Sequence, residues 1–139
     1  MHLVLFQPDI PQNCGTLLRL CACLGVTAHV IEPCGFHLDD RRMRRAGMDY
    51  LSGVELIRHR SWRAYRDSTR GRLLLLTTKA TTPYSDFAFG EADHIMVGRE
   101  SAGVPDEVQD TADARLQIPM RPGFRSLNVA LSAAMVLGE

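Results

Sequence analysis

The chain has 139 residues, 45% of them hydrophobic, and its 16 basic and 16 acidic residues give zero formal net charge. This is the size and composition of one globular domain with a sizeable core. No apolar run reaches the roughly 18 residues of a membrane span, and no secretion signal is recognised at the N-terminus. The four cysteines lie in the first quarter of the chain without any C-x-x-C pair, which argues against a zinc site and favours reduced thiols in a cytoplasmic protein.

The first predicted elements are a strand and a helix joined by a loop. Residues 3–6 form a short apolar run, typical of a buried strand. Two prolines in residues 8–12 favour a loop. Asn13 is expected to cap a helix that continues to about Leu24 and ends at Gly25.

This helix is predicted to bury one face and to expose an arginine. Apolar side chains recur at helical spacing: Leu17, Leu20, Cys21 and Leu24. Arg19 lies about 150° from the centre of that stripe at about 100° per residue. We therefore expect Arg19 to point toward whatever the preceding loop faces.

The rest of the chain alternates short strands with short helices. Strands are predicted at residues 29–31, 54–57, 72–77, 94–97 and 114–118. Helices are predicted over the basic residues 39–46, after a cap at Ser61 and from Pro105 onward. No hairpin signature, linker or internal repeat appears. The pattern predicts a single α/β domain over residues 1–139, with a mainly parallel sheet flanked by helices.

The last stretch leads from a strand end through a loop into an apolar helix. Residues 118–126 contain two prolines and a glycine. Residues 127–137 carry apolar side chains on two helix faces, a pattern typical of burial on both, against the core and against another subunit. Ser126 has the residue type of a helix cap. The unpaired N–H groups of a helix start also favour a ligand that accepts hydrogen bonds.

Arginine dominates the basic residues, with 15 arginines and one lysine. The densest group consists of Arg41, Arg42, Arg44 and Arg45. A guanidinium group forms paired hydrogen bonds with phosphate and stacks on bases, so we predict that this group binds RNA. A solvated helix face paired with neighbouring aspartates would give the same pattern, and zero net charge does not by itself favour nucleic acid.

Three loops that follow predicted strands carry the candidate site. They comprise residues 77–79, 98–103 and 118–126. In open α/β sheets, ligands bind at the carboxyl ends of strands. Gly98 and Gly103 permit close approach of backbone to a ligand, although either glycine alone would fit an ordinary tight turn. Together the three loops favour a small-molecule pocket.

Several familiar chemistries are excluded by missing motifs. The chain contains no G-x-G, no G-x-x-x-x-G-K-[ST], no H-E-x-x-H and no G-x-S-x-G, so dinucleotide, P-loop, zincin and serine-hydrolase signatures are absent. The five histidines are scattered along the chain, and no metal site is predicted from them.

Three segments together resemble the SPOUT superfamily of RNA methyltransferases. Residues 8–22 read P-x-I-P-Q-N-x-G-x-x-x-R-L-C-A, residues 98–105 read G-R-E-S-A-G-V-P, and residues 118–128 begin with I-P-M and end with R-S-L-N. With residues 35–36, 39–50 and 77–79, nearly the whole chain resembles the minimal, single-domain branch. That branch methylates the ribose 2′-hydroxyl of the tRNA wobble nucleotide, cytidine or uridine 34.

The resemblance implies a fold, a cofactor and partners. The fold would be the α/β trefoil knot, with the C-terminal segment threaded through a loop. The protein would be a cytoplasmic homodimer packed through its C-terminal and first helices, acting on the anticodon stem-loop of tRNA, with no membrane and no metal. The cofactor would be S-adenosylmethionine. Matching positions assign its binding to Leu76, Thr77, Gly98, Ile118, Met120, Ser126 and Leu127.

The resemblance also implies Arg19 as the main catalytic residue. A guanidinium that is always charged is a poor base, so we expect Arg19 to bind the adjacent phosphate and to stabilise negative charge on the attacking hydroxyl. Asn13, Glu100 and Asn128 would position Arg19 or the substrate. Glu100 could pair with Arg19 or anchor its own loop.

Two features depart from the family pattern. The family often reads N-L-S-N-A where residues 128–132 read N-V-A-L-S, so the second asparagine is missing. The family's last helix usually continues past the position of Glu139, with further dimer contacts and an aromatic residue, so this helix is expected to be cut short. Methylation of another tRNA or rRNA site, and a non-catalytic RNA-binding or assembly module, therefore remain alternatives.

Overall fold

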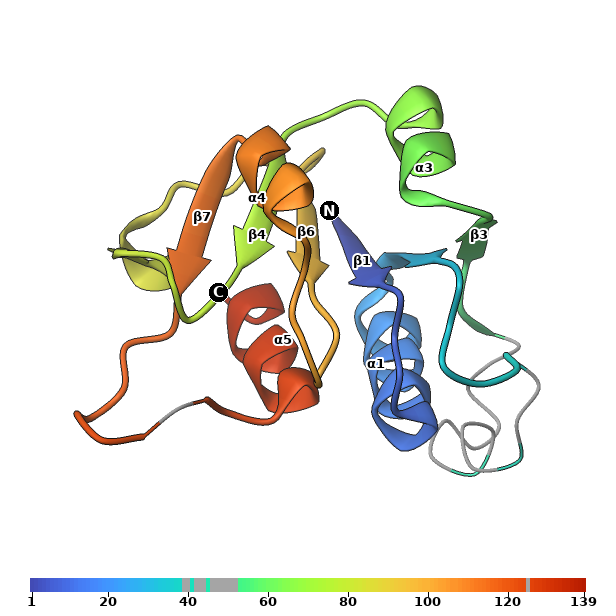
Figure 1. Cartoon of the computed structure of the whole chain (residues 1–139), viewed down its shortest axis with the longest axis horizontal. Coiled ribbons are helices and arrows are strands. Elements are labelled where there is room, and N and C mark those ends of the chain that lie inside the picture. Colours follow the sequence, from blue (N-terminus) through green and yellow to red (C-terminus); the bar gives the residue numbers. More distant parts are fainter. Residues whose placement is uncertain (39–40, 42–44, 46–52, 125) are drawn as a thin grey trace.

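The structure is a computed structural model that describes residues 1–38, 41, 45, 53–124 and 126–139. Within these residues, seven parallel strands form one sheet in the order β3-β2-β1-β6-β4-β7-β5 (Figure 1). The strands are β1 (His2–Phe6), β2 (Thr27–Ile31), β3 (Leu56–His59), β4 (Leu73–Leu76), β5 (Thr82–Pro83), β6 (His94–Val97) and β7 (Ala114–Gln117). No helix in the described part of the chain is long and apolar enough to cross a membrane.

Helices cover both faces of the sheet. The described helices are α1 (Pro11–Leu24), α3 (Trp62–Ser68), the 3-10 turn η2 (Tyr84–Asp86), α4 (Asp106–Thr111) and α5 (Val129–Leu137). Buried side chains of α1 and α5 pack on one face, and those of α3 and α4 pack on the other. Figure 1 shows α1 and α5 side by side. The predicted α/β class with a mainly parallel sheet is confirmed, and the threading of a knot stays a prediction.

Alternating side chains explain why the central strands are apolar throughout. In β1, Leu3 and Leu5 join the core under α1 and α5, whereas Val4 and Phe6 join the core under α3 and α4. All four are at most 2% exposed. A strand that is covered on both faces needs apolar residues at every position.

Two strand predictions need correction. The strand expected at residues 54–57 lies at Leu56–His59, and β5 was not predicted. β5 is only two residues long, and its Pro83 has no N–H group to donate. It pairs at the edge with β7, where a short segment with proline is tolerated but leaves no periodic signal.

The start of α1 differs from the prediction because proline opens the helix. Pro11 is its first residue and Ile10 is the capping position, so the predicted cap at Asn13 is wrong. Proline suits the first helical position because it lacks the N–H group that would have no partner there. The predicted end is confirmed, since Gly25 adopts a left-handed conformation with φ of 68°.

Two other helix starts also differ from the prediction. The cap of α5 is Asn128, whose Oδ1 accepts hydrogen bonds from Ala130 N at 2.8 Å and Leu131 N at 3.2 Å. Ser126 is therefore not the cap of α5. The helix α4 was predicted to begin at Pro105 but begins one residue later, at Asp106.

A third helix start follows the prediction. The expected cap of α3 is confirmed, because Ser61 Oγ accepts a hydrogen bond from Ala64 N at 3.0 Å.

The buried stripe of α1 is rotated from the predicted one. Leu24 is 49% exposed and Leu20 is only partly buried, so these two predictions are wrong. The helix packs against both the sheet and α5, which moves the buried face to Cys14, Leu17, Leu18 and Cys21. Arg19 is partly buried rather than fully directed into solvent.

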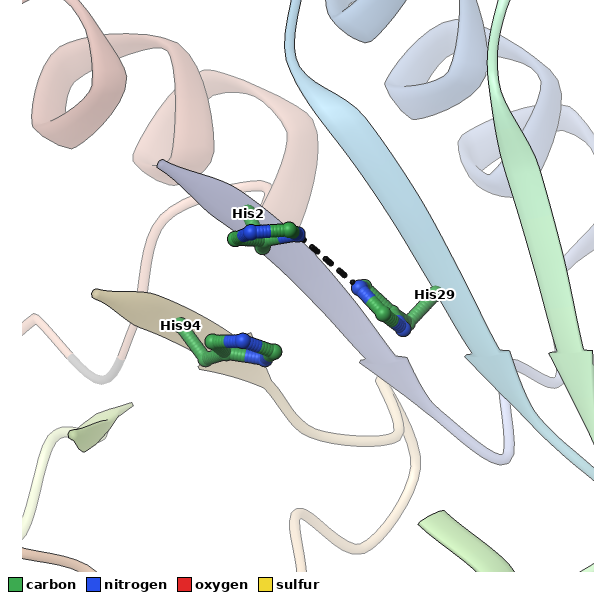
Figure 2. A group of neighbouring side chains, drawn as sticks. All are labelled: His2, His29 and His94. Atoms are coloured by element: carbon green, nitrogen blue, oxygen red, sulfur yellow. Dashed lines mark hydrogen bonds between the residues drawn. The ribbon is translucent and has the colours of Figure 1, made fainter. Parts of the chain in front are cut away.

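Four of the five histidines meet in space beneath α3, although they are scattered in sequence. Parallel neighbours β6, β1, β2 and β3 supply His94, His2, His29 and His59. His2 Nδ1 and His29 Nε2 are joined by a hydrogen bond of 3.0 Å (Figure 2). Two further hydrogen bonds join His29 Nδ1 to His59 Nε2 at 2.9 Å and Tyr65 Oη to His94 Nδ1 at 2.8 Å. Burial lowers the pKa of His29 to about 3 and the pKa of His94 to about 4, so both rings are neutral at pH 7.

Candidate functional site

A pocket of about 640 Å³ lies at the carboxyl ends of β4, β6 and β7. The strand ends are aligned, because Leu76 is the register partner of both Val97 and Leu116. The three loops that follow therefore leave the sheet at the same edge. Residues 75–79, 97–104 and 126–129 line the pocket with Ile10, Asn13, Gln109, Ile118, Met120 and Ser132.

The loop after β6 is closed by hydrogen bonds between its own ends. Arg99 N donates to Gly103 O at 3.1 Å, and Gly103 N donates to Arg99 O at 2.8 Å. A Cβ atom on Gly98 would lie 2.8 Å from Gly103 Cα, and Gly103 has a φ of +63°. Both glycines are therefore required by the backbone of this loop, which forms one wall of the pocket.

The pocket brings together every position that the sequence analysis assigned to the cofactor. Those residues are Leu76, Thr77, Gly98, Ile118, Met120, Ser126 and Leu127. This set combines apolar side chains with the hydroxyl groups of Thr77 and Ser126, which suits a ligand with a flat apolar ring and polar groups. Their roles in binding stay predictions, but their spatial gathering is a property of the fold.

Two of the predicted catalytic residues contact each other at the pocket. Asn128 Nδ2 donates a hydrogen bond to Asn13 Oδ1 at 3.3 Å, which links the start of α5 to the first turns of α1. Arg19 is not among the pocket-lining residues. It lies six residues after Asn13 on α1, about 9 Å further along the helix axis.

Glu100 anchors its loop to the loop that follows β1. Glu100 N donates to Asp9 Oδ1 at 3.2 Å, Asp9 N donates to Glu100 Oε2 at 3.5 Å, and Ser101 Oγ donates to Asp9 Oδ2. This supports the anchoring role that the sequence left open for Glu100. Asp9 was not singled out from sequence; the only signal was an acidic residue inside a proline-containing loop.

The same contacts shift the pKa values of the two carboxyl groups in opposite directions. Burial, followed by the hydrogen bond with Asp9, raises the pKa of Glu100 to about 7. The hydrogen bond to Glu100 is the main cause that lowers the pKa of Asp9. At pH values below about 7 the pair therefore shares one proton, which resides mainly on Glu100.

This shared proton predicts a pH-dependent stability. Because folding raises the pKa of Glu100, its protonation stabilises the folded state. This contribution to stability is fully present below the unfolded pKa of 4.5 and is lost as the pH rises through about 7. Glu100→Gln mimics the protonated form at every pH. We expect the free energy of unfolding of the variant, relative to that of the parent protein, to rise by about 1 kcal/mol from pH 5 to pH 8. The value is small because Glu100 is only partly buried.

Urea unfolding at pH 5 and pH 8 measures this difference. Glu107→Gln, an exposed residue of α4, is the matched control and should show no such gain. A stability difference that is constant with pH, or that falls toward pH 8, would contradict the proton sharing.

The predicted RNA-binding arginines are only partly described. Arg41 and Arg45 are exposed. Arg42 and Arg44 lie outside the described residues, as does most of the helix predicted over residues 39–46. The predicted interaction with RNA stays a prediction.

A parallel α/β sheet with a ligand pocket formed by loops at adjacent strand ends defines the class of this protein. The model of the SpoU rRNA Methylase family matches residues 1–138. The chain therefore belongs to the SpoU rRNA Methylase family.

Relatives with names and solved structures support this placement. A protein of Beijerinckia indica named "tRNA (cytidine(34)-2'-O)-methyltransferase" is 63% identical, and the match covers 99% of this chain and 88% of the relative. A solved structure described as "Structural insights into the 2-OH methylation of C/U34 on tRNA" is 39% identical with a TM-score of 0.93, covering 97% of this chain and 90% of the other.

A more distant structure shares the fold alone. The SpoU methyltransferase AviRb from Streptomyces viridochromogenes, solved in complex with the cofactor AdoMet, has a TM-score of 0.90 at 23% identity. That match covers 99% of this chain and 57% of the larger protein. The sheet and its covering helices thus persist at low sequence identity.

Proposed function

We propose that the protein transfers a methyl group from S-adenosylmethionine to the ribose 2′-hydroxyl of the wobble nucleotide, cytidine or uridine 34, of tRNA. One observation carries the proposal: three motif loops that are distant in sequence meet around one pocket. Full-length relatives that bear this activity in their names support it. A cytoplasmic location follows from the proposed tRNA substrate.

The pocket residues fit the proposed cofactor in size and chemistry. The volume of the pocket lies within the range of small-molecule sites, about 300 to 1,000 Å³. Leu76, Ile118 and Leu127 would pack on the adenine ring, and Thr77 and Ser126 would bond its polar groups. Gly98 allows the loop after β6 to close on itself, because a Cβ atom at this position would meet Gly103, and the closed loop forms one wall of the pocket. When bound, the cofactor supplies an electrophilic methyl group on a sulfonium.

The chain's own residues would mainly align and polarise the attacking hydroxyl. Methyl transfer to an oxygen needs an in-line approach, and a held geometry supplies much of the rate. Arg19 would bind the neighbouring phosphate and stabilise negative charge on the oxygen. The hydrogen bond between Asn13 and Asn128 holds the start of α1 against α5, which fixes the helix that carries Arg19. Glu100 would keep its loop in place through Asp9.

The tRNA anticodon stem-loop would be bound through arginines. Arg41 and Arg45 present exposed side chains, and we assign Arg42 and Arg44 to the same group. Guanidinium groups would contact backbone phosphates and so position the wobble nucleotide without reading its sequence.

The protein would act as a homodimer packed through α1 and α5. Large apolar side chains are exposed on or beside these helices: Ile10 (39%), Leu24 (49%), Leu127 (42%), Leu131 (61%) and Met135 (42%). The inner face of α5 is already buried by Ala133 and Val136. A second apolar face that remains exposed on two adjacent helices is typical of an association surface.

We expect Leu131→Glu to convert a dimer into a monomer. A charged side chain at the most exposed apolar position of α5 would have to be buried in the interface without a partner. Sedimentation velocity at micromolar concentration measures the change. Ile57→Glu, which alters an exposed apolar residue of β3, is the control and should stay dimeric. A parent protein that sediments as a monomer would contradict the proposed dimer.

Methyl transfer to total tRNA from cells lacking this modification tests the proposed function. Labelled S-adenosylmethionine is the donor, and digestion of the labelled tRNA maps the nucleotide. Label on the ribose of nucleotide 34 supports the proposal. Label at another tRNA or rRNA site would assign a different substrate, and failure both to transfer and to bind the cofactor would favour a non-catalytic RNA-binding module.

A further inference from the structure

We propose that His2, His29 and His94 bind a divalent first-row transition-metal ion, with Zn²⁺ as the best match. The three side chains come from the adjacent strands β1, β2 and β6 and face one another on one side of the sheet (Figure 2). One potential ligand atom from each residue lies within 4.8 Å of the other two. This site is separate from the proposed methyl-transfer pocket and independent of that function.

The three rings are close enough to share one ion once their planes turn toward it, because the rings of His2 and His94 are now stacked at an interplanar angle of 16°. The ring centroids are 4.3 Å apart for His2 and His94, 5.1 Å for His2 and His29, and 5.0 Å for His29 and His94. Zinc binds imidazole nitrogen at about 2.0 to 2.1 Å, which places tetrahedral ligand atoms about 3.3 Å apart. His2 Nδ1 and His29 Nε2 are already 3.0 Å apart, so an ion could replace the proton between them with a small rotation of the rings.

Two buried groups would hold the ligand rings in the required orientation. Metal-bound histidines usually donate their second ring N–H to a neighbouring acceptor. His29 Nδ1 is 2.9 Å from His59 Nε2, and His94 Nδ1 is 2.8 Å from Tyr65 Oη. With these nitrogens acting as donors, His29 Nε2 and His94 Nε2 keep their lone pairs for the ion. His59 and Tyr65 are 7% and 1% exposed, so neither can readily turn away.

The chemistry of the triad selects the class of metal. Three neutral imidazoles suit Zn²⁺, Cu²⁺ and Ni²⁺, whereas Ca²⁺ and Mg²⁺ require oxygen ligands. A set of three histidines leaves the fourth tetrahedral position for water, and His2 is the partly exposed member. The positive charge of the Met1 ammonium group lowers the pKa of His2 and of His94, and it would also repel a cation bound between them. We therefore expect a dissociation constant of about 1 to 10 µM rather than a nanomolar one.

The position of the triad indicates a structural role for the ion. His94 begins β6, and the pocket begins at the other end of the same strand, about 10 Å away by strand rise. An ion on the triad would join β2, β1 and β6, which are three adjacent interior strands of the sheet. Zn²⁺ should therefore raise the melting temperature, because it binds the folded state.

The proposal is tested by isothermal titration calorimetry. Zn²⁺ is titrated into the full chain after a chelator has removed any bound metal. The titration uses the Cys23→Ser background, because Cys23 is an exposed free thiol that could bind zinc itself. We expect one ion per chain. His2→Gln removes the ligand whose replacement disturbs the core least, and should weaken binding at least about tenfold. His37→Gln removes an exposed histidine outside the triad and should leave binding unchanged.

The outcomes separate the metal site from a hydrogen-bonded row of histidines. The proposal would be overturned if no binding is seen at Zn²⁺ concentrations up to 100 times the expected dissociation constant. Equal Zn²⁺ affinity in His2→Gln and in the parent protein would also overturn it. If His2→Gln does not fold, Co²⁺ bound to the unaltered triad gives a second readout. Visible absorption of tetrahedral Co²⁺ without a thiolate charge-transfer band supports nitrogen ligation, whereas a thiolate band or a spectrum of hydrated Co²⁺ overturns it.

Discussion

Replacing Arg19 by alanine is expected to lower methyl transfer to tRNA at least about 100-fold, with cofactor affinity unchanged within about twofold. Under the proposed function, Arg19 acts on the phosphate and the attacking oxygen. It is absent from the lining of the pocket proposed for the cofactor. Single-turnover rates with labelled S-adenosylmethionine measure the first effect, and calorimetry of cofactor binding measures the second.

Two further variants show whether charge or geometry matters at this position. Arg19→Lys keeps the charge but loses the planar group that forms paired hydrogen bonds with phosphate, so activity should fall about tenfold rather than be restored. Arg63→Ala removes an exposed arginine of α3 and should leave the rate unchanged. Loss of cofactor affinity in Arg19→Ala would contradict the assigned role and place Arg19 in the binding of the cofactor.

Gly98→Ala is expected to weaken cofactor binding at least about tenfold and to lower methyl transfer in parallel. The new Cβ atom would lie 2.8 Å from Gly103 Cα, and backbone atoms cannot rotate away as a side chain could. The loop would have to open, which breaks the reciprocal hydrogen bonds between Arg99 and Gly103. Since this loop forms a wall of the pocket, the effect should appear in affinity first.

The matched control for this variant is Gly53→Ala. A Cβ atom on Gly53 would meet nothing within 4 Å, so the same change of residue should alter neither affinity nor melting temperature. Calorimetry with S-adenosylmethionine compares the two variants. Unchanged affinity in Gly98→Ala, with the variant folded, would show that the cofactor does not depend on this loop and would contradict the proposed pocket.

The sequence predicted the sheet because buried parallel strands leave a strong local signal. The apolar run that contains Leu73 and Leu74 and the run that contains Ile95 and Met96 are each buried on both faces, and short continuous apolar runs are typical of such strands. The order of the strands left no such trace. The order of the strands depends on which connections cross over from one strand to a distant one, and no short segment of the sequence indicates this.

Helix starts were harder because several residues near each start were suitable caps. Asn13 and Asn128 are both good capping residues, yet only Asn128 caps a helix. The helix α1 starts at Pro11, three residues earlier than predicted, which frees Asn13 to accept a hydrogen bond from Asn128. Local propensity gave the correct type of element and the wrong terminal residue.

The candidate pocket could be predicted because loops at the carboxyl ends of parallel strands must converge. The link between Asp9 and Glu100 and the meeting of His2, His29 and His94 could not. Both join segments that are distant in sequence, and their contacts depend on the register and order of β1 and β6. Residue spacing along the chain carries no information about such neighbours.

The place of β1 in the sheet has a consequence for how the chain folds during its synthesis. β1 pairs on one side with β2, which emerges soon afterwards, and on the other side with β6, which emerges much later. Until β6 has left the ribosome, β1 has an unpaired edge of apolar residues that can pair with other chains. We therefore expect nascent chains that end before His94 to aggregate or to recruit chaperones, and refolding to be slow for a protein of this size.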